Sequence, residues 1–313
     1  MKVAAAQVRS PWLDKQASTK VAIGVLERAA ALGVELVAFP ETFLSGYPFW
    51  VCRTDGARFE DSRQKQAYAY YLDAAVEIGG PEIRDVAEAA ADLKVFTYLG
   101  VAERGATAGR GTVWCTLVAI DPVRGVVGAH RKLVPTHDER MVWGMGDGAG
   151  LRAHPVADFR VSGLSCWENW MPLARAALYA DGTDLHVGVW PGWSSLTADI
   201  TRFIAVEGRI WSMAVSGLPR LADIPSDFPL RDALYEDVDE LPFDGGSGIV
   251  RPDGTWAAGP VVGEEALVIA DVDRDALNSE RLGIDTSGHY SRPDVFSFTV
   301  DRARRLPAHF TGD

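Results

Sequence analysis

The chain has 313 residues, of which 47% are hydrophobic and 24% charged, and its 43 Asp and Glu against 31 Lys and Arg give a formal net charge of −12. This balance is typical of a soluble globular protein that is long enough to bury a sizeable core. The acidic charge excludes nucleic acid as an expected partner, since the arginine-rich residues 302–306 are too few for a basic patch and are expected to be solvated. No stretch approaches the ~20 apolar residues that a membrane span requires.

The predicted elements alternate between strands and helices. In the first half, the pattern predicts a strand at 3–8, a helix at 15–32 and a strand at 34–39. A helical stretch at 65–92, interrupted near 79–81, comes next. Strands at 95–103, 112–121 and 126–134 follow it. The second half predicts strands at 159–165, 185–190, 211–218, 247–254 and 266–273, with helices after Cys166 and at about 196–209. Residues 219–244, rich in Pro, Asp and Glu, predict an exposed loop before the last two strands. Some of these strands are joined by helical crossovers and others by tight turns, which indicates an α/β protein with two mixed sheets.

Residues able to do chemistry stand at the ends of three predicted strands. They are Glu41, Lys132 with Glu139 seven residues further on, and Cys166 at a strand-to-helix junction. Sites in open α/β sheets form where strands end, and such a junction often displays a nucleophile. Convergence of a cysteine, a lysine and carboxylates would therefore make a nucleophilic site.

The chemistry of these groups is complementary. A free cysteine has a pKa near ~8.5, so its thiolate is scarce at neutral pH. A lysine ammonium stabilises the thiolate, and a carboxylate can take the thiol proton. A helix beginning near Met171–Pro172 would add its N-terminal dipole if it points at the sulfur.

Three blocks contain these residues: FPETFLSGYP (39–48), HRKLVPTHDERMVWGMGDG (130–148) and CWENWMPLARAALYADG (166–182). A fourth block, GHYSRPDVFSFTVD (288–301), lies near the end. In this order they resemble the nitrilase superfamily, and they are more similar to nitrilases proper than to the amidase branches. The resemblance implies an αββα sandwich of two mixed sheets flanked by helices. It also implies that Glu41 is the general base, that Cys166 is the nucleophile and that Lys132 stabilises charged intermediates. Glu139 matches a second glutamate that positions Lys132 and the substrate.

The same resemblance implies a reaction and an assembly. A small nitrile would be converted to a carboxylic acid and ammonia through a thioimidate and a thioester, without a metal or an organic cofactor. Residues 1–285 are expected to form one catalytic domain. Residues 286–313 are expected to form an extension at an oligomer interface, in a homodimer or a larger homo-oligomer such as a spiral. The tail is short for a nitrilase, so a compact oligomer is as plausible as a long filament.

Four further residues are predicted to contact the substrate: Tyr47, Thr136, Trp167 and Trp190. Aromatic walls would suit an aryl or arylaliphatic nitrile, although core packing explains most aromatic residues equally well. The backbone N–H of Trp167, with Lys132, is the expected donor to negative charge that develops on the substrate. The segment EGRIWSMAV departs from the family pattern at Ile210 and Trp211, which could shift specificity.

Plain structural roles remain open for several of these residues. Cys166 could be a buried small hydrophobe, Glu41 a cap after Pro40, and Lys132 a solvated charge. An ion pair with Lys132 or Arg140 would be enough to retain Glu139. The other cysteines, Cys115 within a strand and Cys52, are expected to be structural.

Rival functions are also open. A Cys–His hydrolase is disfavoured, because none of the six histidines has a local sequence that resembles that of a general base. A metal site is disfavoured, because no histidine has a His or Cys partner at the spacing of metal ligands. An amidase, a cyanide-hydrolysing or amide-forming relative, and a catalytically silent scaffold are the alternatives. Three scattered cysteines predict a reducing compartment and hence a cytoplasmic protein, and the first residues read as a strand rather than a signal peptide.

Overall fold

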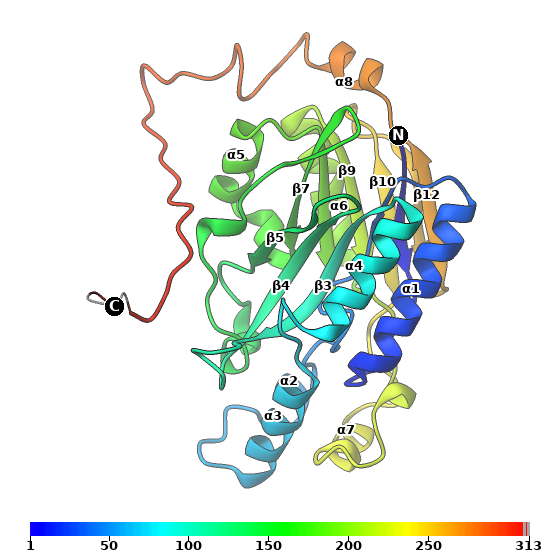
Figure 1. Ribbon diagram of the computed structural model, residues 1–313, viewed down its shortest axis with the longest axis vertical. Coiled ribbons are helices and arrows are strands. Elements are labelled where there is room, and N and C mark those ends of the chain that lie inside the picture. The colour runs from blue at the N-terminus through cyan, green and yellow to red at the C-terminus, as the bar shows by residue number, and fades with distance from the viewer. Residues whose placement is uncertain (309–310, 312–313) are drawn as a thin grey trace.

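Two six-stranded sheets lie at the centre of the computed structural model, which describes residues 1–308 and 311 (Figure 1). The first sheet contains, in spatial order, β12 (Ala266–Asp271), β1 (Lys2–Gln7), β2 (Leu36–Ala38), β3 (Phe96–Arg104), β4 (Val113–Asp121) and β5 (Gly125–Arg131). The second contains β11 (Trp256–Val262), β10 (Gly245–Val250), β9 (Trp211–Ser216), β8 (Leu185–Trp190), β7 (Phe159–Ser165) and β6 (His154–Val156). In both sheets three neighbouring strands run parallel, β1–β2–β3 and β7–β8–β9, and the outer strands pair antiparallel. Both sheets are therefore mixed, as predicted.

The sheets pack face to face through apolar side chains. Successive residues of a strand point to opposite faces, and in β3 Phe96 and Tyr98 join the cluster between the sheets while Leu99 and Val101 join the cluster under the helices. The hydroxyl of Tyr98 crosses the layer and donates to the carbonyl of Val161 in β7 over 3.0 Å. The core of the protein is thus the layer between the two sheets.

Four helices cover the outer faces of the sheets, which completes the predicted αββα sandwich. On the first sheet lie α1 (Lys15–Ala31) and α4 (Pro81–Leu93), and on the second lie α5 (Pro172–Ala180) and α6 (Ser194–Gly208). Figure 1 shows α1 and α4 side by side, as their mutual contacts require. The carboxylate of Asp14 accepts from the N–H of Ala17 and caps α1, a common start signal.

The remaining helical segments are α2 (Trp50–Arg53), α3 (Ser62–Ala74), α7 (Arg231–Asp237), α8 (Arg274–Glu280) and short 3-10 turns at His137–Met141, Gly148–Gly150, Cys166–Trp170 and Leu221–Asp223. Residues 219–244, predicted as an exposed loop, instead contain α7 and are anchored by buried Phe228 and Leu234. The ring of Phe228 lies 4.9 Å from that of Trp12, in a cluster with α2 and α3. The prediction weighed the polar composition and overlooked the spaced apolar residues.

Two strands were not predicted, and both are edges of the second sheet. β6 has three residues and includes Pro155, and β11 includes Pro260 and has no buried residue. Proline and exposure are typical of edge strands, and they weaken the apolar alternation by which a strand is recognised. Three strands rather than two therefore follow residue 244.

The chain after α8 leaves the layered body and follows a wide arc in Figure 1. It returns at its arginine-rich stretch, where Arg302 pairs with Asp181 at 2.9 Å and Arg304 with Asp147 at 3.2 Å. The expectation that these arginines are solvated was therefore wrong for Arg302 and Arg304, which are half-buried against these aspartates, whereas Arg305 is exposed as expected. Within the described residues, no helix is long and apolar enough to cross a membrane.

Candidate active site

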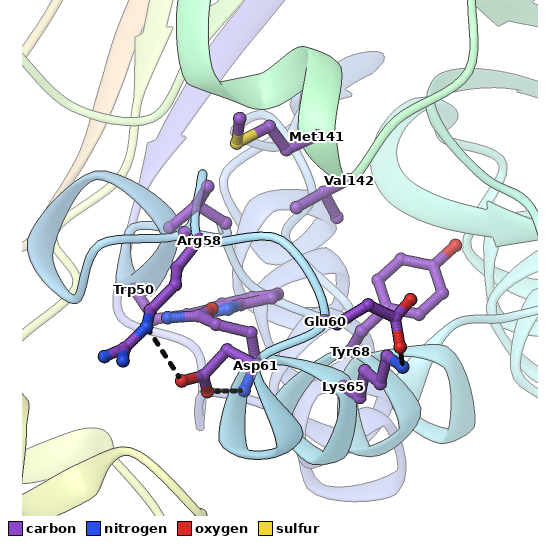
Figure 2. A pocket seen from close by; sticks show the side chains of 11 residues that line it. Trp50, Arg58, Glu60, Asp61, Lys65, Tyr68, Met141 and Val142 are labelled. Atoms are coloured by element: carbon purple, nitrogen blue, oxygen red, sulfur yellow. Dashed lines mark hydrogen bonds and ion pairs between the residues drawn. The ribbon is translucent and has the colours of Figure 1, made fainter.

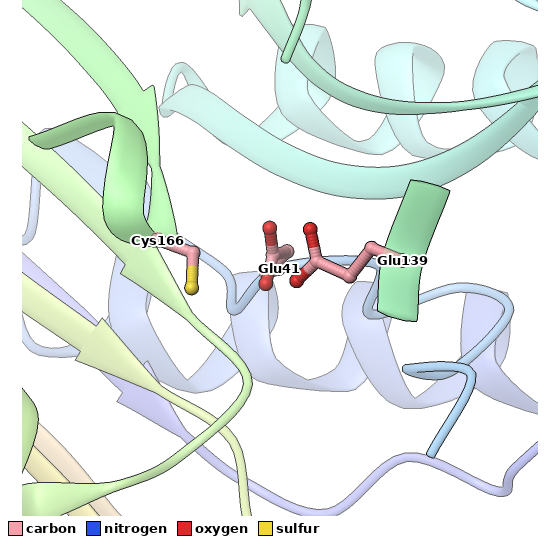
Figure 3. A group of neighbouring side chains, drawn as sticks. All are labelled: Glu41, Glu139 and Cys166. Carbon is pink, nitrogen blue, oxygen red and sulfur yellow. The ribbon is translucent and has the colours of Figure 1, made fainter. Parts of the chain in front are cut away.

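Glu41, Lys132, Glu139 and Cys166 meet at one buried point between the two sheets. The ammonium nitrogen of Lys132 lies 2.9 Å from Oε1 of Glu41 and 2.7 Å from Oε2 of Glu139. Sγ of Cys166 and one carboxylate oxygen of each glutamate lie within 4.8 Å of one another. Figure 3 shows Cys166 and Glu139 approaching from opposite sides, with Glu41 between them in that view. None of the four residues is more than 4% exposed, so the predicted convergence is present.

The first sheet supplies the charged residues. Glu41 follows β2, and Thr42 after it has a φ of 49°. Such a left-handed conformation is an outlier for a β-branched residue and often marks a functional turn. Lys132 follows β5, and its backbone N–H donates to the carbonyl of Cys115 in β4 over 2.8 Å. The strands β2 and β5 therefore direct the side chains of Glu41 and Lys132 toward the site.

Glu139 is placed by its own 3-10 turn, His137–Met141. Its Oε2 accepts from the backbone N–H of Thr136 over 2.6 Å, in a reciprocal capping box. Its Oε1 accepts from the hydroxyl of Tyr47 over 2.9 Å. With Lys132 as a third donor, this carboxylate has three polar partners that hold it in one orientation.

Cys166 stands at a sharp turn after β7. Its φ of 52° is left-handed, and it begins the 3-10 turn Cys166–Trp170. The predicted helix α5 starts at Pro172. The element that begins at Cys166 is therefore the short 3-10 turn and not α5. The side-chain amide of Asn169 donates to the carbonyl of Cys166 over 2.8 Å and holds the turn closed.

Glu168 ties this turn to the strand end that bears Lys132, and sequence reasoning missed it. Its carboxylate accepts from the N–H of Ser165 at 3.1 Å and the N–H of Leu133 at 2.6 Å, and it lies 2.9 Å from Nε2 of His130. Burial alone would raise the pKa of this carboxyl, but His130 and the two N–H groups hold it below its usual value. The Ser-x-x-Glu spacing of Ser165 and Glu168, typical of a capping box, was the available signal.

Cys115 is buried in a strand, as expected, yet it also contacts the site. Its Sγ lies 3.2 Å from Oε1 of Glu41. Cys52 is exposed, and its Sγ lies 3.3 Å from the carbonyl of Phe49. The prediction of a purely structural role for Cys115 did not anticipate this contact, because Glu41 is 74 positions away in the chain.

Burial sets the protonation of the reacting groups. It raises the pKa of the Glu41 carboxyl to about 7, against the lowering effect of Lys132. It also raises the pKa of the Cys166 thiol well above its usual value, although Lys132 opposes this. The resting sulfur is therefore a thiol that needs a base, and Glu41 ionises in the range in which a base works best.

The ammonium of Lys132 is the positive charge of the site. Burial alone would lower its pKa, but Cys166 in its ionised form and the carboxylates of Glu41 and Glu139 raise it well above the usual value. Burial and the neighbouring Glu139 likewise raise the pKa of Tyr47, whose hydroxyl stays protonated and donates to that carboxylate. The arrangement can therefore hold a fixed cation against a substrate atom that becomes negative.

The residues predicted to touch substrate lie in different surroundings. Tyr47 and Thr136 both contact Glu139. Trp167 is 44% exposed and its ring centroid lies 6.4 Å from that of Trp170. Trp190 is 2% exposed and belongs to the core cluster that includes Cys166. Substrate contact stays a prediction for all four.

Two cavities lie near the site. A small one of about 40 Å³ reaches Glu41 and Tyr47, with Pro191 and Leu218 opposite. A larger one of about 280 Å³ lies beside the 3-10 turn of Glu139, between Met141 and α3, and contains the ion pairs Arg58–Asp61 and Glu60–Lys65 (Figure 2). None of the four converging residues lines the larger cavity.

Comparisons with known proteins agree with this geometry. The carbon-nitrogen hydrolase family model matches residues 2–281. The chain is 34% identical over 300 residues to a nitrilase of Bradyrhizobium diazoefficiens and 38% identical over 302 residues to a protein named nitrilase 2 from an unknown prokaryotic organism; each alignment covers 96% of this chain and 92% of the relative. Among solved structures, Nit3 of Saccharomyces cerevisiae, a nitrilase-superfamily member, shares the fold with a TM-score of 0.71 at 17% identity, over 93% of this chain and 96% of that one.

Proposed function

The chain belongs to the carbon-nitrogen hydrolase family and is of the nitrilase type, and we propose that it converts an organic nitrile and two water molecules to a carboxylic acid and ammonia. The observation that carries the proposal is the buried meeting of Cys166 with a lysine held between two carboxylates. A lysine and two glutamates in the core have a high desolvation cost, and a nucleophilic site is the use that fits all of them.

The first step forms a covalent intermediate. Glu41 accepts the proton of the Cys166 thiol, and the sulfur bonds to the nitrile carbon. The nitrile nitrogen then takes this proton from Glu41, and the product is a thioimidate with Glu41 again a carboxylate. Lys132 and the backbone N–H of Trp167 donate to the negative charge that develops on the substrate, and the loss of one such donor typically costs a factor of ~100 to 1,000 in rate.

The second and third steps consume the water molecules. Glu41 takes a proton from the first water, whose oxygen adds to the thioimidate carbon. The nitrogen takes that proton from Glu41 and a second proton from the added hydroxyl, the carbon–nitrogen bond breaks, ammonia leaves and a thioester remains. The second water attacks the thioester, the carbon–sulfur bond breaks, the carboxylic acid departs and Cys166 regains its proton. No metal or organic cofactor enters these steps.

Glu139 acts through its neighbours rather than on the reacting carbon. It places the ammonium of Lys132, at 2.7 Å from its Oε2, and Tyr47 restrains its other oxygen. Tyr47, Thr136, Trp167 and Trp190 form the substrate-contacting set of this proposal. The aromatic members favour an aryl or arylaliphatic nitrile over a small aliphatic one.

We also propose a domain organisation, an oligomeric assembly and a cellular compartment for the enzyme. Residues 1–285 form one catalytic domain, and residues 286–313, of which 309–310 and 312–313 lie outside the described residues, form an extension that lies between copies of the chain, as a dimer or a larger homo-oligomer. Exposed apolar side chains at Tyr290, Val295 and Phe296 support a covered position for this extension, since soluble surfaces seldom leave such groups together in water. The free state of all three cysteines is consistent with the cytoplasm.

The decisive experiment is ammonia release from a panel of nitriles that contains aliphatic, arylacetonitrile and aromatic members and cyanide, with matched amides beside them. The parent chain is compared with Cys166→Ala and with Cys52→Ala, which removes an exposed cysteine outside the site. Turnover of a nitrile by the parent and Cys52→Ala, lost in Cys166→Ala, supports the proposal. Turnover of amides alone moves the chain to the amidase branch, and silence on every substrate overturns the proposed activity.

A further inference from the structure

The two oxygens of the Glu41 carboxylate are held differently. Oε1 accepts from the ammonium of Lys132 over 2.9 Å and lies 3.2 Å from Sγ of Cys115. Oε2 is fully buried and has no hydrogen-bond partner among the described residues. A buried polar atom without a partner is uncommon and calls for an explanation. The explanation that fits the site is that Oε2 is kept free for a proton.

Cys115 contacts two residues of the site, one through its side chain and one through its backbone. It lies in β4 and is 1% exposed. Its thiol faces Glu41, and its backbone carbonyl accepts from the N–H of Lys132 over 2.8 Å. Burial and the charge of Glu41 raise the pKa of the Cys115 thiol well above its usual value. The sulfur therefore keeps its proton and is the donor in this contact.

We propose that Cys115 is a positioning residue: its thiol donates to Oε1 of Glu41 and, with Lys132, turns the carboxylate so that Oε2 is the atom that accepts the proton from Cys166. This inference rests on the proposed function, because it names the reacting oxygen of the proposed base. Cys115 forms no bond to the substrate in this scheme. It has the same relation to Glu41 that Tyr47 has to Glu139.

A role in packing alone makes different predictions from a role as a donor. Cys115→Ser keeps a donor at nearly the same place but puts a hydroxyl among apolar neighbours, whereas Cys115→Val fills the space and removes the donor. If the residue only packs, Cys115→Val should equal the parent and Cys115→Ser should be the weaker variant. If the residue orients Glu41, the order of activity should be reversed. Cys115→Ala gives a second variant without a donor, should Cys115→Val not fold.

The test measures kcat, KM and the pH profile of nitrile hydrolysis for these variants, with thermal unfolding as the check on folding and Cys52→Val as the matched cysteine control. Loss of the donor should lower kcat about fivefold to tenfold, the value of one weak hydrogen bond, with little change in KM. It should also move the acid limb of kcat/KM to higher pH by up to about one unit, because Glu41 would lose a bond that favours its charged form. Cys115→Ser should restore both quantities toward those of the parent.

A second readout does not need turnover. The rate at which iodoacetamide alkylates Cys166, followed by mass spectrometry against pH, reports the transfer of its proton to Glu41. The same upward shift is expected in Cys115→Val and Cys115→Ala, and not in Cys115→Ser. Variants whose kcat, pH profile and alkylation rate all match the parent would overturn the inference. If the parent is silent on every nitrile while Cys115→Val and Cys115→Ala still show the shift in alkylation, the proposed function is removed and the role of Cys115 is kept.

Discussion

The two halves of the site are held in place by different means. In the first-sheet half, charges hold one another: the ammonium of Lys132 lies between the carboxylates of Glu41 and Glu139. In the second-sheet half, no side chain of the described residues hydrogen-bonds to the sulfur of Cys166, and its backbone is held instead, by a left-handed φ of 52° and by Asn169 and Glu168. A nucleophile must be free at its reactive atom, so rigidity is supplied to the turn beneath it. Groups that act by their charge can be restrained through that charge.

Breaking the charged half should have the largest effect. Lys132→Met leaves the carboxylates of Glu41 and Glu139 buried without their cation. We expect loss of detectable nitrile hydrolysis and a fall of about 3–5 kcal/mol in the free energy of unfolding, the usual result of removing one partner of a buried pair. Urea unfolding and ammonia release measure the two effects.

The matched control for that substitution is Lys65→Met, at the exposed pair with Glu60. Surface pairs contribute about 0–1 kcal/mol, so stability and activity should stay near those of the parent. Equal losses of stability and activity in the two variants would show that Lys132 contributes no more than an ordinary surface charge.

Loosening the nucleophile half should have a smaller effect. In Glu168→Gln an amide replaces the carboxylate that accepts from Ser165 and Leu133. The turn should relax enough to misplace the sulfur of Cys166, which we expect to lower kcat roughly 10- to 100-fold. Steady-state kinetics with the best nitrile give this value, and thermal unfolding follows the accompanying loss of about 1–3 kcal/mol.

Glu240→Gln is the control for this change, because Glu240 also accepts from backbone N–H groups but is itself exposed and lies outside the site. It should leave kcat unchanged. A Glu168→Gln variant with the kcat of the parent would mean that the turn keeps its shape without the carboxylate.

The pH profile sharpens the comparison without a mutation. Burial raises the pKa of Glu41 to about 7, and the base must be ionised to take a proton. kcat/KM should therefore rise with pH up to about 7 and level off above it, and each unit below should lower it about tenfold. A profile measured from about pH 5 to about pH 9 tests this, and one that stays flat down to its acid end would assign Glu41 an ordinary pKa.

Tyr47→Phe should give the smallest change. It removes the hydroxyl that donates to Oε1 of Glu139, while Thr136 and Lys132 still hold Oε2. We expect a loss of about fivefold in kcat, equal to about 1 kcal/mol. The same kinetic assay measures it, and a loss as large as that of Lys132→Met would show that the Tyr47 hydroxyl does more than restrain Glu139.

Most of the layered fold could be predicted from periodicity, since long apolar runs mark buried strands and spaced apolar residues mark helices. The failures have a common cause. Residues 219–244 look polar on average, yet Phe228 and Leu234 are buried against Trp12 and its cluster. Edge strands β6 and β11 carry proline, β6 has only three residues, and no residue of β11 is buried. In each case the neighbours that bury or expose the segment come from distant parts of the chain.

The sequence by itself determined which residue types end the strands, and these local patterns were enough to predict Glu41, Lys132, Glu139 and Cys166 as one group. Only the tertiary structure decided how the group is held. Glu168 meets Leu133 across 35 positions, and Cys115 meets Glu41 across 74. Periodicity tells which face of a strand a side chain occupies, but the partner on that face depends on strand order and register. Long-range pairing therefore decides which oxygen of Glu41 stays free.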